Sequence, residues 1–405
     1  MNMQIGPILS TLRRHRFTCT LLILQIALTC AIVCNAVFLV RDRLAWMDTP
    51  SGVDEDRLVR IEVGDIGIHT DMHARTLADL AALREIPGVE DATVANSVPF
   101  GDRSWNSGLG LQRDQHVSSL NTGNFYGERI GEIMGVQLAE GRWFRPDEYR
   151  WMDDVVSAKV KVAPSIILSK DAADRLFPDG HPIGRSVFVG DNDMRVVGVV
   201  KRLSRAGGGD RGQAAFSTMV PLREYPAMGA AFLLRVKPGE ADRVLTAAAA
   251  KLRQLDPRRV VTGKQRYGDI RDAYFASDRA MAVLLVGVCI ALLTVTALGI
   301  VGLASFWVGQ RRRQIGVRRA LGARRVDVLR YFQTENFLLA SIGIGLGMVM
   351  AYGMNLLLMW QYEVPRLPLV YLPSGAIILW LLGQVAVLAP ALRAAAVPPV
   401  VATRG

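Results

Sequence analysis

The chain has 405 residues, of which half are hydrophobic, and carries a formal net charge of +11. The apolar residues come in long blocks, and the excess positive charge lies in short segments beside those blocks. The positive-inside rule of membrane proteins explains this arrangement without a polyanionic partner, so no nucleic-acid partner is expected.

Four stretches contain no Asp, Glu, Lys or Arg: residues 17–40, 280–310, 336–359 and 374–392. About 20 apolar residues in a helix that rises 1.5 Å per residue cover a hydrocarbon core of ~30 Å. The sequence therefore predicts four transmembrane α-helices.

The first stretch has an alternative interpretation as a cleaved secretory signal. Three arginines (Arg13, Arg14 and Arg16) precede it, and small residues lie near its end. The apolar core of a signal runs only ~7–15 residues, which is shorter than this stretch. A retained anchor is the better interpretation.

The charge distribution predicts the topology. Residues 1–16 contain three arginines, residues 311–335 contain eight arginines against two carboxylates, and residues 393–405 contain two arginines. The loop 360–373 is neutral. The charges of these four segments already account for the net charge of +11 of the whole chain, so residues 41–279 are neutral as well. We therefore expect the two terminal segments and 311–335 in the cytoplasm, and 41–279 and 360–373 outside.

The large external segment contains two β-α-β patterns. The first has strands at 57–63 and 89–97 around a helix at 74–84, and the second has strands at 231–237 and 259–264 around a helix at 240–254. These patterns predict a split ferredoxin-like lobe formed by about 50–99 and 227–266.

An inserted lobe of about 100–226 separates the two patterns. Short alternating runs, such as 165–168 and 195–200, predict a β-rich α+β lobe with one helix at 170–176. We expect residues 267–279 to form a stalk helix that continues into the second span. The fold class is thus a membrane protein with four helices and a large α+β external domain between spans 1 and 2.

Few residues in the chain point to catalysis. The sequence contains no GxxxxGK[ST] motif, so it does not predict ATP hydrolysis by that route. All four cysteines lie within the spans, and Cys30 and Cys34 are interpreted as small buried hydrophobes rather than a metal or redox pair. His69 and His73 have the spacing of two zinc ligands, but without HExxH or an evident third ligand we interpret them as surface histidines. No catalytic residue, cofactor or metal is expected on this chain.

The segment 311–335 is more than a topology signal. Arginines that bind anionic lipid headgroups would explain Arg311, Arg312 and Arg313. After them, apolar residues alternate with arginine at helical spacing, which predicts a helix with a small-residue face and a basic flank, suited to contact with another protein. The residues of this predicted docking helix are Ile315, Gly316, Arg318, Arg319, Ala320, Leu321, Gly322 and Ala323.

The run "RRRQIGVRRALGARRVDVLRYFQTE" (311–335) resembles the cytoplasmic segment of FtsX/MacB-type ABC transporter permeases. Three external stretches are similar to the MacB-like periplasmic core: "LAEGRWFRPDE" (138–148), "ILSKDAADRLFPDGHPIGRSV" (167–187) and "RVVGVVKRL" (195–203). The tail "PALRAAAVPPVVATR" (390–404) resembles the end of the FtsX-like permease domain. Gln314 stands where the family usually has glutamate.

The resemblance implies a permease subunit of the inner membrane with a periplasmic domain, and an ATPase on another chain that binds ATP and Mg²⁺. Residues 315–323 would dock on that ATPase and pass its motion to the periplasmic domain, for efflux or extrusion of a drug, peptide or lipid-linked substrate. The implied partners are ABC ATPase subunits, a second permease copy or paralogue, membrane lipid, and a periplasmic adaptor with an outer-membrane channel. A lipoprotein-releasing permease and an FtsX-like scaffold that activates a cell-wall hydrolase are the alternatives.

Two further features concern helix packing. Gly343 and Gly347 form a GxxxG motif in the third span, which predicts a close helix contact either with another span of this chain or with a second permease. Gln25, Asn35 and Gln384 are the strong polar groups within the spans. We interpret them as interhelical hydrogen-bonding groups rather than as a substrate path.

Overall fold

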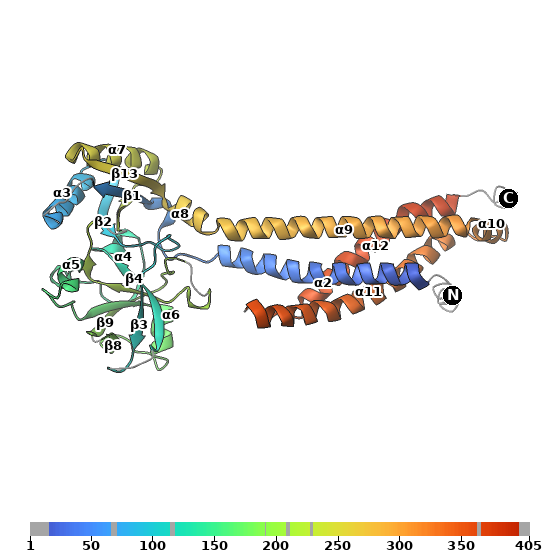
Figure 1. The fold of residues 1–405 in the computed structure, drawn as a ribbon, viewed down its shortest axis with the longest axis horizontal. Helices are drawn as coiled ribbons and strands as arrows, with labels where there is room; N and C mark the ends of the chain where they lie inside the picture. Colours follow the sequence, from blue (N-terminus) through green and yellow to red (C-terminus); the bar gives the residue numbers. More distant parts are fainter. Residues whose placement is uncertain are drawn as a thin grey trace. The chain divides into compact units, whose positions relative to one another are not determined.

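The computed structural model describes residues 16–65, 71–113, 118–190, 192–207, 211–226, 230–362 and 366–396. The chain divides into two compact units, which are Met1–Met47 with Asp278–Gly405, and Asp48–Ser277. The first unit is helical and the second is a mixed α and β domain (Figure 1).

The helical unit contains four helices long and apolar enough to cross a membrane, which confirms the predicted spans. They are α2 (Arg16–Met47), α9 (Ala276–Gln310), α11 (Arg325–Tyr362) and α12 (Tyr371–Ala396), with the short α10 (Arg312–Ala320) between α9 and α11. Helix α9 has 35 residues, or roughly 52 Å at 1.5 Å per residue, so it is longer than the ~30 Å hydrocarbon core requires.

Helix α11 packs against both α2 and α12. The GxxxG motif makes the contact with α2, because a Cβ atom added at Gly343 would lie 2.8 Å from Ile26 Cγ2, and one at Gly347 would lie 2.5 Å from Cys30 Cβ. The partner that the sequence left open is therefore the chain's own first span. Since α2 supplies fully buried residues to this core, it is part of the folded unit.

Polar side chains within the spans form interhelical hydrogen bonds, as predicted. Gln25 Nε2 donates to the Val295 carbonyl at 3.2 Å, and Asn35 Nδ2 donates to the Ala351 carbonyl at 3.0 Å. Gln384 Nε2 donates to the Gln333 carbonyl at 3.5 Å. These groups join α2 to α9 and α11, and α12 to α11.

In the second unit, the predicted ferredoxin-like lobe is present. Its sheet has the order β13 (Arg259–Arg266), β1 (Leu58–Asp65), β12 (Ala231–Val236), β2 (Val89–Ala95), and every pairing is antiparallel. Helices α3 (Met72–Arg84) and α7 (Ala241–Leu255) share one buried core with these strands. Their apolar residues recur at the spacing that places them on one helix face.

The inserted lobe contains a seven-stranded sheet that closes on itself. Its order is β5 (Leu138–Gly141), β9 (Asn192–Val200), β7 (Ser165–Ser169), β10 (Ser217–Val220), β4 (Leu120–Tyr126), β3 (Asn106–Gly110), β8 (Ser186–Val189), and β8 also pairs with β9. A two-stranded sheet joins β6 (Arg150–Trp151) to β11 (Leu222–Arg223). Closure leaves few free sheet edges.

The prediction of one helix in the inserted lobe is wrong. Besides α6 (Lys170–Leu176), the lobe contains α4 (Ile130–Ile133) and α5 (Met152–Val156). Helices of four and five residues are too short to show a 3.6-residue period in the sequence. The single-turn 3₁₀ segments are Glu55–Arg57, Pro146–Glu148 and Arg211–Gln213.

The continuous stalk helix is also a wrong prediction. Helix α8 (Tyr267–Tyr274) ends at Phe275, whose ψ of 3° is far from helical values, and α9 begins at Ala276. Phe275 is buried, and its ring packs 5.1 Å from that of Phe100. Packing of this ring into the domain interrupts the helix.

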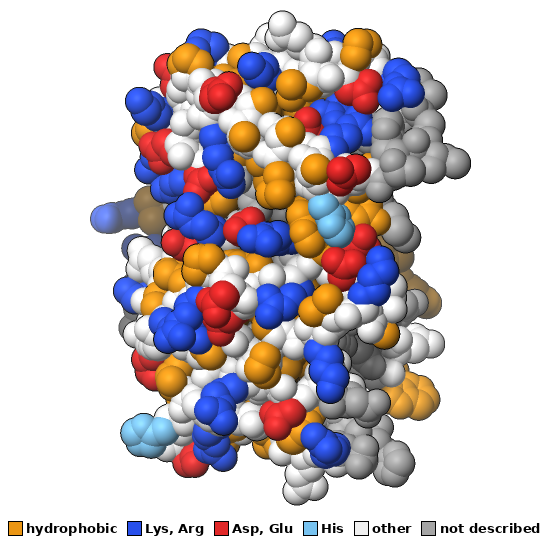
Figure 2. All heavy atoms as spheres, turned by 90° about the vertical axis from the view of Figure 1, so that its left-hand side faces the viewer, with side chains coloured by type: hydrophobic (Ala, Val, Ile, Leu, Met, Phe, Trp, Pro, Cys, Tyr) orange, Lys and Arg blue, Asp and Glu red, His pale blue; other side chains and the backbone are white. Residues whose placement is uncertain are grey.

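The two lobes share a third hydrophobic core, which includes Leu58 and Leu233 from the ferredoxin-like sheet and Phe125 and Met219 from the inserted sheet. A common core makes the lobes one folded body. On the face drawn in Figure 2, acidic and basic side chains are interspersed, in agreement with the neutral charge of residues 41–279.

Candidate functional site: the arginine-rich segment and its anchor

The arginine-rich segment is a short helix held at both ends. Arg311 is the single turn residue between α9 and α10, and its N–H donates to the Trp307 carbonyl at 3.0 Å. At the other end, Gly322 has a φ of 99°, a conformation that favours glycine, and the Arg324 N–H donates to Asp327 Oδ2 at 3.0 Å. This contact caps the start of α11.

An ion pair fixes the base of the segment. The Arg311 guanidinium donates to both oxygens of Glu335, at 3.0 and 3.2 Å, and to the Tyr331 hydroxyl at 3.4 Å. Its Cζ also lies 5.6 Å from the centroid of the Trp307 ring. The Glu335 side chain is 1% exposed and that of Arg311 is 14% exposed. A bidentate pair with so little solvent contact holds the end of α9 against α11.

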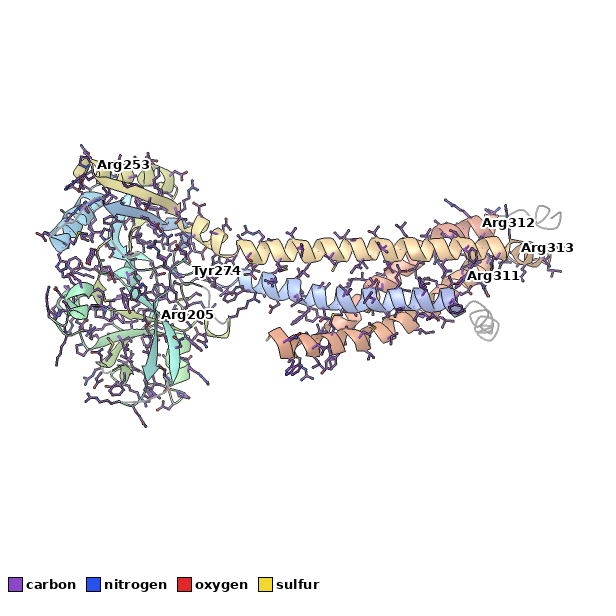
Figure 3. The ribbon with its side chains drawn as sticks, viewed as in Figure 1. Arg205, Arg253, Tyr274, Arg311, Arg312 and Arg313 are labelled. Atoms are coloured by element: carbon purple, nitrogen blue, oxygen red, sulfur yellow. The ribbon has the colours of Figure 1, made fainter. Side chains whose placement is uncertain are left out.

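Arg311, Arg312 and Arg313 lie at the same end of the helical unit (Figure 3). Of the three, Arg311 forms the ion pair with Glu335, which we call the anchor, whereas Arg312 and Arg313 are exposed. The sequence pattern predicts only a topology role for Arg311, and the pairing with Glu335 was not predicted. The signal that could have found it is a carboxylate that lies directly before an uncharged span and so needs a cationic partner.

The eight predicted docking residues include both buried and exposed positions. Ile315 and Gly316 are buried, and Ile315 belongs to the core formed with Val328 and Phe332. These two hold α10 in place and are not on the surface of this chain. Ala320, Leu321 and Gly322 are exposed and Ala323 is half-buried, while the side chains of Arg318 and Arg319 lie outside the described residues.

The exposed part is apolar at its centre. Leu321 is 84% exposed and Val317 is 45% exposed. Val317 was absent from the predicted docking set. These two side chains form the apolar part of the surface that α10 and the following turn expose among their arginines.

The external motifs of the sequence form rigid turns. In "LAEGRWFRPDE", Gly141 has a φ of 78°, and Arg142 donates to both oxygens of Glu148, at 2.8 and 2.9 Å. Ser165 donates to the same carboxylate at 2.6 Å. The Arg142 guanidinium is the main reason that the pKa of Glu148 falls to about 2.

The second motif is the turn "LFPDGHPIG". Gly180 and Gly184 have φ values of 77° and 82°. Arg185 donates to both oxygens of Asp179, and its Cζ lies 4.4 Å from the centroid of the Phe177 ring. The motif residues thus serve the folding of the inserted lobe.

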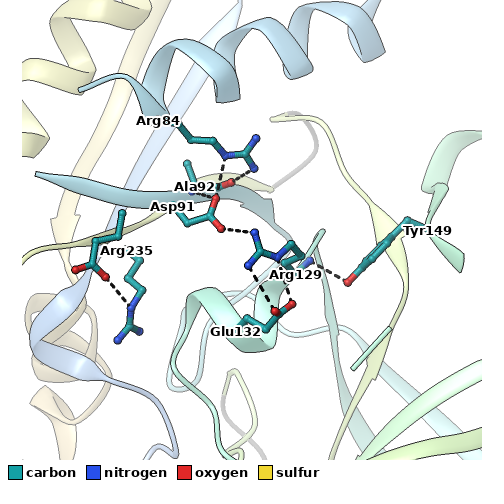
Figure 4. A network of polar contacts seen from close by, with 8 residues as sticks. Arg84, Asp91, Ala92, Arg129, Glu132, Tyr149 and Arg235 are labelled. Carbon is teal, nitrogen blue, oxygen red and sulfur yellow. Dashed lines mark hydrogen bonds and ion pairs between the residues drawn. The ribbon is translucent and has the colours of Figure 1, made fainter. Parts of the chain in front are cut away.

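Polar contacts also bridge the two lobes (Figure 4). Asp91 on β2 accepts from Arg84 Nε at 2.9 Å and from Arg129 Nη1 at 2.8 Å. The Arg129 N–H donates to the Tyr149 hydroxyl at 3.0 Å. This chain of contacts connects the ferredoxin-like sheet to the inserted lobe next to their common core.

The histidines of "HTDMH" are only partly described. His69 lies outside the described residues. His73 is not a free surface histidine, because its Nε2 lies 2.9 and 3.0 Å from the two oxygens of Asp153, and its ring stacks on Trp151.

Comparison with known proteins finds two family models that match successive parts of the chain. Residues 20–255 match the family model of the MacB-like periplasmic core domain, and residues 285–399 match the model of the FtsX-like permease C-terminal region. The first match covers more than half of the chain and includes most of α2 and most of the second unit.

Curated relatives include a macrolide export ATP-binding/permease protein MacB from Chromobacterium violaceum. It is 31% identical over 235 residues, which are 56% of this chain and 34% of that protein. The uncharacterized ABC transporter permease YvrN of Bacillus subtilis is 25% identical over 303 residues, which are 71% of this chain and 72% of that protein. The chain spans about a third of the length of the MacB relative.

Among solved structures, the periplasmic region of MacB from Actinobacillus actinomycetemcomitans matches 56% of this chain and 97% of that chain, with a TM-score of 0.33 and 14% identity. The extracellular domain of the transporter YknZ from Gram-positive bacteria matches with a TM-score of 0.31 and 16% identity, over 50% of this chain and all of that chain. From the two family matches, the chain belongs to the MacB/FtsX-type ABC transporter permease family, with a MacB-like periplasmic core domain and an FtsX-like permease C-terminal region.

Proposed function

We propose that this chain is the permease subunit of an ABC transporter and that α10 with the following turn docks on a separate ATPase subunit. The observation that carries the proposal is the anchor between Arg311 and Glu335. It attaches a surface of Val317, Ala320 and Leu321 to two long helices at once. A force on that surface would act directly on α9 and α11.

Helix α9 is the route to the periplasmic domain. It runs without interruption from Ala276 to Gln310. Near its outer end, Asp278 accepts from Arg43 of α2 at 2.5 Å, so the first and second spans are tied together there. A displacement at α10 would reach the outer ends of both spans, which flank the periplasmic domain in sequence.

The helical unit is better suited to transmission than to conduction. A cavity of about 20 Å³ between α9, α11 and α12 is lined by residues such as Leu303, Trp307 and Asn336. This cavity has room for about one water molecule. The larger space of about 410 Å³, between α2 and α9, is an open groove on the side of the helices. We therefore propose that the substrate is taken up in the periplasm and extruded from there, in the inner membrane of a cell with two membranes.

The names of the relatives support a proposal for the substrate class and the partners. Because the MacB relative is named as a macrolide exporter, we propose efflux of a drug, peptide or lipid-linked molecule. A second permease is proposed to complete the transporter, since α9 is buried against this chain over little of its length. A periplasmic adaptor and an outer-membrane channel would complete the path.

Co-purification tests the docking surface. We expect Leu321→Asp to reduce recovery of the ATPase with the tagged permease by at least about tenfold, because a charge replaces the exposed apolar centre. The matched control is Leu369→Asp, since Leu369 is 66% exposed in the loop between α11 and α12. Equal recovery with both variants would remove α10 as the docking element.

A further inference from the structure

Three side chains of types that can ligate a metal meet where the two lobes of the periplasmic domain join. His73 is the second residue of α3, in the ferredoxin-like lobe, and Asp153 and Asp154 are in α5, in the inserted lobe. One ligand atom from each of the three lies within 4.8 Å of the other two. None of them is on the arginine-rich segment, so the site is independent of the proposed docking.

The histidine ring is held in place before any ligand binds. It lies parallel to the Trp151 ring, with centroids 4.0 Å apart and an interplanar angle of 2°. Its Nε2 points at the Asp153 carboxylate, at 2.9 and 3.0 Å from the two oxygens. Trp151 directly precedes α5, so the element that carries both aspartates also orients the histidine.

The local charge favours a divalent cation over the ion pair alone. The two aspartates face the His73 ring, and Lys159 Nζ lies 3.5 Å from Asp154 Oδ1. The half-buried Glu224 places a third carboxyl group near Asp153. Two carboxylates and a neutral imidazole would balance the charge of a doubly charged ion.

The donor set favours Zn²⁺ over Mg²⁺ and Ca²⁺. Imidazole nitrogen with carboxylate oxygen suits Zn²⁺, whereas Mg²⁺ and Ca²⁺ prefer oxygen ligands alone. With bonds of about 2.0–2.1 Å, tetrahedral ligand atoms lie about 3.3 Å apart. The nitrogen-to-oxygen separation of 2.9 Å needs to widen by only a few tenths of an ångström, and the Asp154 oxygen needs to approach.

We propose that His73, Asp153 and Asp154 form a zinc site that clamps α3 of the ferredoxin-like lobe to α5 of the inserted lobe. Three protein ligands leave the fourth position open to water or to a ligand from another molecule. The ion would replace the direct hydrogen bond between His73 and Asp153.

Calorimetric titration of the full-length protein in detergent, after removal of metal with EDTA, tests the site. Titration with ZnCl₂ should give one site per chain that MgCl₂ does not fill. His73→Gln and Asp154→Asn should each weaken zinc binding by more than about tenfold, because each removes one ligand. The control is Asp174→Asn, since Asp174 is an exposed carboxylate that pairs only with Lys170 among the described residues.

Hydrogen exchange locates the bound ion and separates the proposal from zinc held elsewhere. Zinc should slow amide exchange at the starts of α3 and α5 in the wild-type and Asp174→Asn proteins, and should have no effect there in His73→Gln. Zinc binding that His73→Gln leaves unchanged, or no change in exchange at both helices, would overturn the proposal.

Discussion

At the scale of single residues, Glu148 stabilises the inserted lobe through its pair with Arg142. Its pKa in the folded protein is about 2, below the ordinary value of 4.5. The stabilisation is therefore complete above pH 4.5 and is lost as the pH falls toward 2. Solvent screens part of the effect, so we expect Glu148→Gln to lower the free energy of unfolding at pH 7 by about 1–2 kcal/mol.

The measurement for Glu148 is urea unfolding of the wild type and of Glu148→Gln at pH 7 and pH 3. The two curves should differ at pH 7 and approach each other at pH 3. A constant difference at both values would mean that the ionised carboxylate is not the source of the stability.

Glu224, in contrast to Glu148, destabilises the folded protein when it is ionised. Burial raises its pKa to about 7, and the charge of Asp153 adds to the shift. Since the folded pKa lies above the ordinary value, ionisation destabilises the folded state, and the penalty grows from pH 4.5 to pH 7. We expect Glu224→Gln to raise the free energy of unfolding by about 1–3 kcal/mol at pH 8 and to change it little at pH 5, when both are measured in EDTA.

At the scale of helices, the contact between α2 and α11 depends on glycines of one face. A Cβ at Gly347 would lie 2.7 Å from the Ala27 carbonyl oxygen, whereas one at Gly345 has open space. Gly347→Ala should therefore separate the helices and lower the melting temperature in detergent by several degrees. Gly345→Ala is the matched control and should leave it unchanged. Equal melting temperatures would argue against this packing.

Removing one or the other partner of the anchor of α10 should lower the stability by different amounts. Arg311→Gln leaves the Glu335 carboxylate buried without its cation, which costs about 3–5 kcal/mol. Glu335→Gln is milder, because Arg311 retains some exposure. Thermal unfolding should rank Arg311→Gln as the less stable variant, and adding Glu335→Gln to it should recover much of the loss. Arg312→Gln, at an exposed position, is the control. A single variant as stable as the wild type would contradict the anchor.

At the scale of the whole molecule, the charge distribution predicts that the domain between the first two spans and the docking surface after α10 lie on opposite sides of the membrane. Cysteine introduced at Val160 should react with a membrane-impermeant maleimide in spheroplasts, and cysteine introduced at Leu321 only after the membrane is permeabilised. Both positions are exposed, and the native cysteines lie within the spans. Labelling of Leu321→Cys in intact spheroplasts would reverse the topology and exclude ATPase docking at α10.

The sequence by itself determined the four spans, the charge asymmetry and the two β-α-β patterns, because hydrophobic length, charge and periodicity are local properties of a chain. Only the tertiary structure decided which groups meet across long separations. It paired β8 with β9 and β3, Gly347 with Cys30, Arg311 with Glu335, and His73 with Asp153. The interruption at Phe275 was missed for the same reason, since packing against the distant Phe100 decides it. The proposed docking segment was predicted from the sequence, because it is one continuous run of residues. Its anchor and the proposed metal site belong to this second class, because each needs side chains from several elements, and local pattern carries no information about which elements will touch.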